Sequence, residues 1–381
     1  MKKRYDQEDS YCTSFITKVI HCEKRKDDYC IILEKTYFYP EGGGQAADQG
    51  YIGEVFVYDV HEIGGEIIHY TKEALEVGKQ YECKIDWKRR FDHMQNHSGE
   101  HIVSGLIHKR YGYNNVGFHM GKVIQIDFDG PLSIEDCRII EKEANQCIMK
   151  NVDIVASFPD ITKIDYRSKK EIEGDVRIVT IEGIDACACC GTHVRKTGEI
   201  GCIKILSVEK HKQGVRLEMI AGMRAYSYLA KIYEENHKVS VSLSAPMEDI
   251  ATYVEHLKEE NERLKKEKDT ILEEYFTLKI QQNINTEFYI DYLEDKDKKA
   301  IRNYANMALE KGYETVAIFN KHEDVYDYLF LSHTMDVRRI AKMINEKANG
   351  QGGGKEDMVQ GRIHCTKEEI EEMMGVIVNG R

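Results

Sequence analysis

Short runs of β-favouring residues dominate the first 85 positions of the chain. The runs 14–20, 29–34, 53–60 and 66–70 are separated by Gly, Asp and Lys turn signals. This spacing predicts a small N-terminal β-barrel. From Trp87 the apolar and histidine positions recur at helical spacing as far as a turn cluster at 111–115, which predicts one long helix.

The middle of the chain mixes strand and helix patterns. Residues 123–128 alternate as a strand does, residues 133–149 predict a helix capped by Ser133, and further strands are expected near 152–157, 176–181 and 202–208. The mixture predicts an α/β two-layer domain.

From Ile250 to Leu278 the apolar or buried-type positions recur at alternating steps of four and three, with Glu and Lys between them. This heptad pattern predicts a long helical arm with coiled-coil character, although Asn261 and Lys268 interrupt the apolar stripe. The alternative is a solvated single helix packed on its own domain. After it, strands at 288–292, 315–319 and 328–331 alternate with helices at 295–311, 335–347 and 366–377, which predicts a C-terminal α/β domain.

The predicted fold class is therefore α+β and multidomain. Four domains are expected: a β-barrel domain at 1–86, an α/β domain at 87–237, a helical arm at 238–283 and a C-terminal domain at 284–381. A length of 381 residues fits several domains better than one.

Charge and cysteine content narrow the class of protein. The formal net charge of -12 argues against an obligate nucleic-acid coat but not against a local basic groove. Cys187, Cys189 and Cys190 crowd into four of the 381 positions, which favours a metal site in a reducing compartment over disulfides. Without an apolar leader or a membrane-length apolar run, we expect a cytoplasmic protein.

Two short motifs carry the candidate metal chemistry. His97 and His101 lie four residues apart, which places both on one face of a helix, and Cys189 and His193 repeat the spacing. A set of imidazole and thiolate donors suits zinc. Cys187 and Cys190 are alternative thiols, but Cys189 alone has the four-residue spacing to His193.

A metalloprotease is disfavoured, because Ser98 stands where His-Glu-x-x-His requires the catalytic Glu. Four protein ligands normally describe a closed structural site, whereas catalytic zinc keeps a position for water or substrate. Either one ligand moves away on substrate binding, or the metal orients the substrate while neighbours handle the water. The candidates for that catalytic role are Thr36, Gln45, Glu100 and His119.

Two glycine-rich segments and several cations are candidate binding elements. The glycines Gly42, Gly43 and Gly44 free the backbone for close approach, although a hairpin loop would use them equally well. The run 350–361 predicts a flexible, anion-friendly loop that is neither a Walker loop nor a dinucleotide fingerprint. The candidate contacts to nucleic-acid phosphates are Lys88, Arg89, Arg90, Lys210, Lys212, Arg216, Gly352, Gly353, Gly354 and Lys355. For the basic residues, the alternative is scattered surface charge.

Four motifs in order resemble one family. Residues 96–101, 189–194 with 197–201, and 36–48 look like the editing domain of alanyl-tRNA synthetase and its free-standing AlaX-type relatives; residues 214–225 resemble the segment that leaves this domain. The 350–361 run is similar to the DHH-associated C-terminal domain. The chain resembles the long free-standing form, since it begins at the barrel. Cys190 stands where the family usually has Gly, and no Asp-His-His motif precedes the C-terminal domain.

The resemblance implies hydrolysis of the ester that joins serine, or possibly glycine, to alanine-specific tRNA, with one zinc ion per chain. Thr36 would contact the serine hydroxyl, with Gly42, Gly43, Gly44 and Asp48 at the substrate. A homodimer through the arm or the C-terminal domain is expected. The alternatives are a non-catalytic, zinc-stabilised tRNA-binding or adaptor protein, and an enzyme that edits another aminoacyl-tRNA such as threonyl-tRNA.

Overall fold

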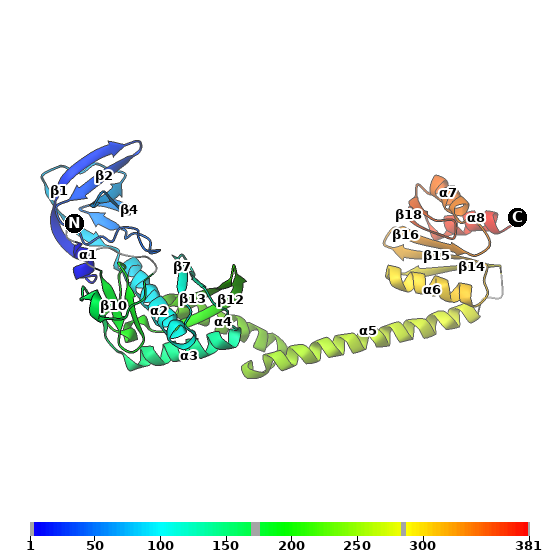
Figure 1. Cartoon of the computed structure of the whole chain (residues 1–381). Coiled ribbons are helices and arrows are strands. Elements are labelled where there is room, and N and C mark those ends of the chain that lie inside the picture. The colour runs from blue at the N-terminus through cyan, green and yellow to red at the C-terminus, as the bar shows by residue number, and fades with distance from the viewer. Residues whose placement is uncertain (1–3, 169–175, 283–286, 380–381) are drawn as a thin grey trace. The chain divides into compact units, whose positions relative to one another are not determined.

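The computed structural model describes residues 4–168, 176–282 and 287–379. It divides into an N-terminal unit, Met1–Lys238, and a C-terminal unit, Val239–Arg381 (Figure 1). Both units combine helices with sheets, which confirms the α+β multidomain class. The predicted boundary between 283 and 284 lies outside the described residues. Within the described ranges, none of the helices is long and apolar enough to cross a membrane.

A closed barrel of six strands forms the start of the N-terminal unit, in the order β1-β2-β5-β4-β3-β6, and confirms the predicted barrel. All its strand pairs are antiparallel. Alternate apolar side chains such as Val19, Val57 and Cys83 fill its interior. The short helix α1 (Tyr5–Glu8) is followed by β1 (Ser14–Arg25), β2 (Asp28–Leu33), β3 (Gly50–Ile52), β4 (Val55–Ile63), β5 (Glu66–Thr71) and β6 (Gln80–Ile85).

Helix α2 (Trp87–Tyr111) follows the barrel directly and is the central element of this unit. The Asp86 side chain accepts a hydrogen bond from the Arg89 N–H, and the helix ends at Gly112 with a φ of 74°. Every residue from 93 to 107 is buried, so this helix is enclosed on all sides. Glycines allow that enclosure: a Cβ at Gly99 would lie 2.9 Å from the Ala221 Cβ.

Two sheets and a second helix surround α2. The four-stranded sheet has the order β12-β13-β8-β7, and the three-stranded sheet has the order β11-β10-β9. The predicted helix α3 (Ile134–Lys150) is confirmed, with Ser133 and Asp136 forming a reciprocal capping box. The strands are β7 (Asn115–Met120), β8 (Ile124–Phe128), β9 (Ile154–Ser157), β10 (Ile178–Ile181), β11 (Asp185–Ala188), β12 (Ile203–His211) and β13 (Gly214–Ala221), with 3-10 turns η1 (Ile161–Lys163) and η2 (Thr197–Ile200).

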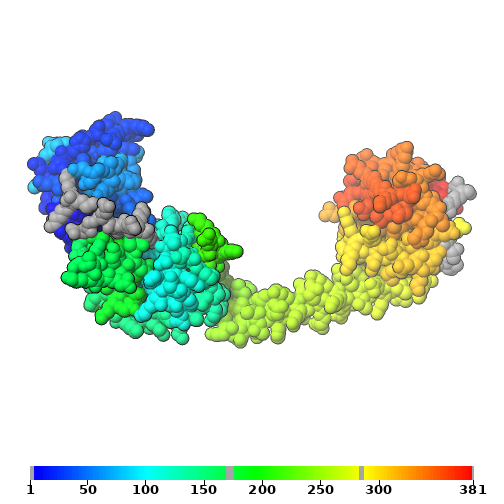
Figure 2. All heavy atoms as spheres, in the orientation of Figure 1, coloured from blue at the N-terminus to red at the C-terminus, as the bar shows by residue number. Residues whose placement is uncertain are grey.

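The predicted arm is present as a long helix. Helix α4 (Met223–Leu243) is followed by the turn η3 (Met247–Asp249) and by α5 (Ile250–Gln281). The apolar side chains of the predicted stripe from Leu257 to Leu278 are about half exposed, from 46% at Tyr275 to 60% at Leu278, whereas Ile250 and Val254 are partly buried. The yellow-green atoms of this helix are visible along its length in Figure 2. Coiled-coil pairing stays a prediction.

A five-stranded sheet with the order β14-β15-β16-β18-β17 forms the core of the C-terminal unit. One core joins it to α7 and α8, and another joins it to α6 and the end of α5, so helices cover both faces (Figure 1). The elements are β14 (Phe288–Glu294), α6 (Lys298–Glu310), β15 (Thr315–His322), β16 (Val325–Ser332), α7 (Arg338–Lys347), β17 (Gln351–Gly354), β18 (Met358–Ile363) and α8 (Lys367–Asn379). The expectation of a loop at Gly352–Gly354 was wrong, because these glycines form β17 and pair with β18.

Candidate metal centre and its surroundings

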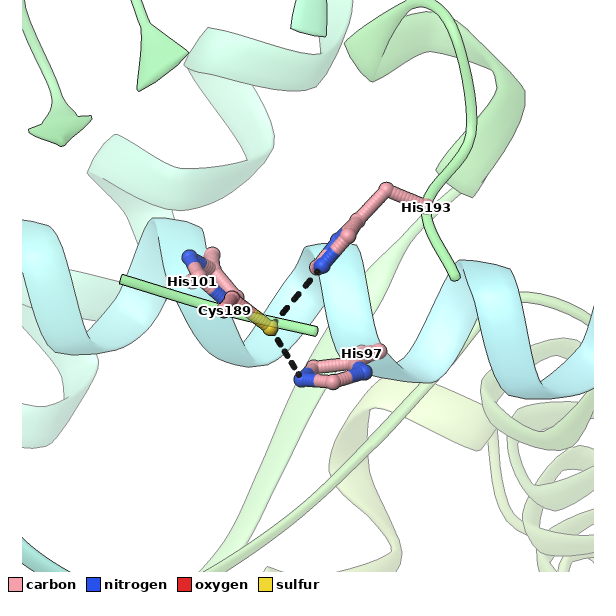
Figure 3. A group of neighbouring side chains, drawn as sticks. All are labelled: His97, His101, Cys189 and His193. Atoms are coloured by element: carbon pink, nitrogen blue, oxygen red, sulfur yellow. Dashed lines mark hydrogen bonds between the residues drawn. The ribbon is translucent and has the colours of Figure 1, made fainter. Parts of the chain in front are cut away.

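Four side chains from two distant segments converge in the N-terminal unit. His97, His101, Cys189 and His193 each offer one donor atom, and these atoms all lie within 4.8 Å of one another. The Cys189 Sγ lies 3.4 Å from the His97 Nε2 and 3.3 Å from the His193 Nε2 (Figure 3). Helix α2 supplies the first two histidines, and the segment after β11 supplies the other pair.

The Nδ1 atom of each of the three histidines has a hydrogen-bond partner outside the cluster. The His97 Nδ1 lies 2.9 Å from the Gln45 Oε1, the His101 Nδ1 lies 2.9 Å from the Asp185 Oδ2, and the His193 Nδ1 lies 3.2 Å from the Ser98 Oγ. Gln45 and Asp185 offer acceptor oxygens there, so Nδ1 carries the proton on His97 and His101. In the neutral imidazole this tautomer leaves Nε2 unprotonated, as metal binding requires.

The ionisation of the cluster also suits a cation. Burial would raise the pKa of the Cys189 thiol, but the surrounding histidines His97, His193 and His101 hold it well below its usual value. Burial lowers the pKa of His101, but its hydrogen bonds to Asp185 and Cys189 outweigh burial and raise that pKa well above its usual value. Burial lowers the pKa of His193 to about 3, which keeps that imidazole neutral. Thiolate and neutral imidazole are the metal-binding forms of these side chains. The arrangement is therefore compatible with a bound metal ion, which would displace the extra proton of His101.

The loop between Cys189 and His193 is shaped around His97. A Cβ at Gly191 would lie 2.1 Å from the His97 Cε1, so only glycine fits there. Arg177 donates to the carbonyl oxygens of Cys189 and Gly191 at 2.8 and 3.0 Å and fixes the loop. Cys190 is exposed and is not among the residues with positive φ. A cysteine therefore fits this position without backbone strain.

The first glycine-rich segment lies beside the metal cluster. Gln45 is fully buried, and besides the His97 contact it donates from Nε2 to the Thr192 Oγ1 at 2.9 Å. Gly44 has a φ of 84°, and a Cβ there would lie 2.6 Å from the Phe118 ring, which itself stacks on His97. Gly43 has open space around it, and the Gly42 carbonyl accepts from the Tyr39 hydroxyl.

Thr36 forms a hydrogen bond with His69, a buried histidine of the barrel. The His69 Nδ1 lies 3.1 Å from the Ile31 carbonyl oxygen, which can only accept, so Nδ1 carries the proton. The Thr36 hydroxyl then donates to the His69 Nε2 at 2.9 Å, and the Phe38 N–H donates to the Thr36 oxygen at 3.1 Å. That oxygen can accept one further hydrogen bond, but it has no proton left to donate.

The other two candidate catalytic residues have different surroundings. Glu100 is buried on α2 and accepts from the Ser104 hydroxyl at 2.6 Å and from the Asn115 amide at 2.5 Å. His119 is exposed on β7, opposite Gln125 of β8.

Asp48 and Arg90 form a fully buried ion pair at the junction of barrel and α2. Arg90 also donates to the carbonyl oxygens of Ser10 and Tyr37, both at 2.7 Å, and Asp48 accepts from the Tyr39 N–H. The expectation that Arg90 contacts tRNA phosphate does not fit this position, because its guanidinium is enclosed by protein groups. The expectation that Asp48 contacts substrate does not fit either, because its carboxylate is fully buried against Arg90.

The remaining predicted tRNA contacts lie nearer the surface. Lys88, Lys210 and Lys212 are exposed, and Arg89 is partly buried. Arg216 is engaged by both carboxylate oxygens of Asp127, at 2.7 and 2.9 Å. In the C-terminal unit, the predicted contacts Gly352, Gly353, Gly354 and Lys355 are all exposed.

Some residues that support the metal cluster were not predicted to do so from the sequence. Asp185 is one of them: Arg167 holds its carboxylate with two hydrogen bonds of 2.8 and 2.9 Å, and Asp185 in turn holds His101. In the sequence, the feature that could have pointed to Asp185 is its position four residues before Cys189. Ser98, which argued against a protease, is the residue that faces His193.

Three segments of the chain match known families. Residues 176–218 match the threonyl and alanyl tRNA synthetase second additional domain, residues 10–89 match class II (A) tRNA synthetases, and residues 285–377 match the DHHA1 domain.

Whole-chain relatives point the same way. The chain is 30% identical to the alanyl-tRNA editing protein Aarsd1 of Danio rerio, over 97% of this chain and 96% of that protein. It is 28% identical to the alanyl-tRNA editing protein AlaX-L of Pyrococcus horikoshii, over 97% and 96%. An alanine–tRNA ligase of Ignicoccus hospitalis is 30% identical over 96% of this chain but only 42% of the ligase. The chain therefore belongs to the family of alanyl-tRNA editing proteins.

Proposed function

We propose that this protein is a trans-editing hydrolase that removes serine, and possibly glycine, from mischarged alanine-specific tRNA, with one zinc ion per chain. The observation that carries the proposal is the convergence of three imidazole nitrogens and one thiolate, each imidazole held from behind at Nδ1. Family membership supplies the reaction class, aminoacyl ester hydrolysis.

The donor set favours zinc. Three nitrogens and one sulfur in a buried cluster match the ligand types of zinc and exclude magnesium or calcium, which prefer oxygen donors. When bound, zinc supplies a Lewis acid that can orient and polarise the ester. The His97, His101, Cys189 and His193 side chains would hold it.

The hydrogen bonds of Thr36 in the barrel support recognition of serine. The Thr36 oxygen can accept one more hydrogen bond, so it suits a substrate hydroxyl that donates. A site with such a polar partner discriminates far better than an apolar one. Glycine has no hydroxyl, and its release would not use this contact.

The tRNA body requires cations outside the centre. Lys88, Lys210, Lys212 and the β17 edge with Lys355 are the accessible candidates. A cytoplasmic location, where charged tRNA is used, and a homodimer through α5 or the C-terminal unit belong to the same proposal.

Deacylation measured side by side on Ser-, Gly- and Ala-tRNA(Ala) tests the function. We expect release of serine, weaker release of alanine, sensitivity to a zinc chelator, and loss of activity in His97→Ala. If the wild-type protein binds tRNA but releases no amino acid, the non-catalytic adaptor is the better account. Release from Thr-tRNA alone would favour editing of another aminoacyl-tRNA.

A further inference from the structure

A pocket of about 470 Å³ lies next to the metal cluster in the N-terminal unit. Its lining includes Arg89 and His93 of α2, Ala46 of the glycine-rich segment, Lys122 of the β7–β8 turn, and Arg224 at the start of α4. His93 lies one helical turn before the metal-binding His97, and Ala46 directly follows Gln45, the partner of His97. Helix α2 and the glycine-rich segment therefore contribute residues both to the pocket and to the metal cluster or its partners.

The pocket is cationic. Arg89, Lys122 and Arg224 carry three positive charges, and within the part of the chain that the structure describes only Arg224 is paired with a carboxylate, that of Asp92. Arg224 also donates to the carbonyl oxygens of Gly121 and Lys122 at 2.5 and 3.1 Å, so it fixes the turn that presents the Lys122 side chain. Arg89 donates from Nε to the Ala47 carbonyl at 3.0 Å, which holds its guanidinium at the pocket wall.

His93 is an unexplained polar group in this wall. It is 4% exposed, and its Nδ1 is buried with no hydrogen-bond partner among the described residues. A buried polar atom without a partner is rare in folded proteins and commonly marks a site completed by a ligand or water. Burial and the neighbouring Arg89 lower the pKa of His93 to about 4, so the imidazole is neutral at pH 7.

We infer that this pocket binds the phosphodiester next to the aminoacylated 3′-terminal nucleoside of the tRNA, through Arg89 and Lys122, with His93 in its wall. The inference rests on the proposed function and adds to it the group that positions the ester. A phosphate anchored one helical turn from His97 holds the adjoining ribose ester close to the cluster, and anchoring a remote group is an efficient way to orient a reacting bond. The β7–β8 turn and the glycine-rich segment then both contact the acceptor end.

Two substrates test the inference, and only one of them carries the tRNA body with its terminal phosphodiester. Ser-tRNA(Ala) carries the phosphodiester, and 3′-O-seryladenosine does not. For Lys122→Ala and Arg89→Gln we expect kcat/KM on Ser-tRNA(Ala) to fall about tenfold each, with a change of under about twofold on seryladenosine. The dependence of log(kcat/KM) on log salt should also become shallower by about 0.7 for each cation removed.

Matched variants separate this effect from misfolding and from bulk charge. Arg89→Lys keeps the charge and should recover most of the activity, and Arg138→Ala removes an exposed cation of α3 and should change neither substrate. Equal losses on both substrates, or none on either, would overturn the inference.

If the wild-type protein hydrolyses neither ester, the proposed function fails. Binding measurements then test whether the pocket holds a phosphodiester. The trinucleotide CCA should bind the wild-type protein more tightly than it binds Lys122→Ala, whereas adenosine should not distinguish them. Equal affinity of CCA for both proteins would refute the phosphate site.

Discussion

The side-chain oxygen of Gln45 accepts a hydrogen bond from the His97 Nδ1 at 2.9 Å and another from the Thr192 N–H at 3.1 Å. One amide therefore holds a metal-ligand candidate from α2 and the loop that carries the other ligand pair. Partners of this kind fix the ring and the tautomer of a ligating histidine.

Replacement of Gln45 tests that role. Gln45→Ala should weaken zinc binding by about 10- to 100-fold, because His97 loses its orienting acceptor. Competition with a chromophoric chelator measures the affinity. Gln45→Glu keeps an acceptor for His97 and should lose less; equal affinity of Gln45→Ala and wild type would contradict the role.

The Arg90–Asp48 pair should dominate the stability of the junction between barrel and α2. Arg90→Met leaves the Asp48 carboxylate buried without its cation, which should lower the free energy of unfolding by about 3–5 kcal/mol. Guanidinium denaturation measures it. Arg110→Ala, which removes a partly exposed pair with Glu143, should cost under about 1 kcal/mol and is the matched control.

His69 should make the N-terminal unit sensitive to acid. Burial lowers its pKa in the folded protein to about 4, against 6.5 when unfolded, so the unfolded chain binds the extra proton between these values. The contribution is complete above pH 6.5 and is lost as the pH falls towards 4. Between pH 7 and pH 5 the wild-type protein should lose about 2 kcal/mol more than His69→Gln. Parallel pH profiles in urea denaturation would argue against this assignment.

Thr36→Val removes the oxygen that can accept from a serine hydroxyl while keeping the side-chain shape. Serine release from tRNA(Ala) should fall by at least about tenfold, with glycine release almost unchanged. Thr36→Ser keeps the oxygen and should retain selectivity. Equal loss on all esters would show that Thr36 supports the barrel and not the choice of substrate.

Local patterns were predictable from the sequence, and long-range partners were not. The His97–His101 spacing and the α2 boundaries depend on neighbouring residues, so periodicity and the turn at 111–115 suffice. Arg90 stands in a Lys-Arg-Arg run that resembles solvated charge, and only its pairing with Asp48, 42 positions earlier, explains its burial. Gly352–Gly354 looked like a loop because glycine has a low strand preference, but pairing with β18 determines the strand.

Closure of the six-stranded barrel has a consequence for self-association. Every barrel strand has a neighbour on each side, so this sheet offers no free edge to a second polypeptide. The five-stranded sheet is open and ends at β14 and β17, and all four residues of β17 are exposed. The folded barrel should therefore resist strand exchange between chains. In the C-terminal unit, β17 is an exposed edge strand to which a strand of another chain can pair.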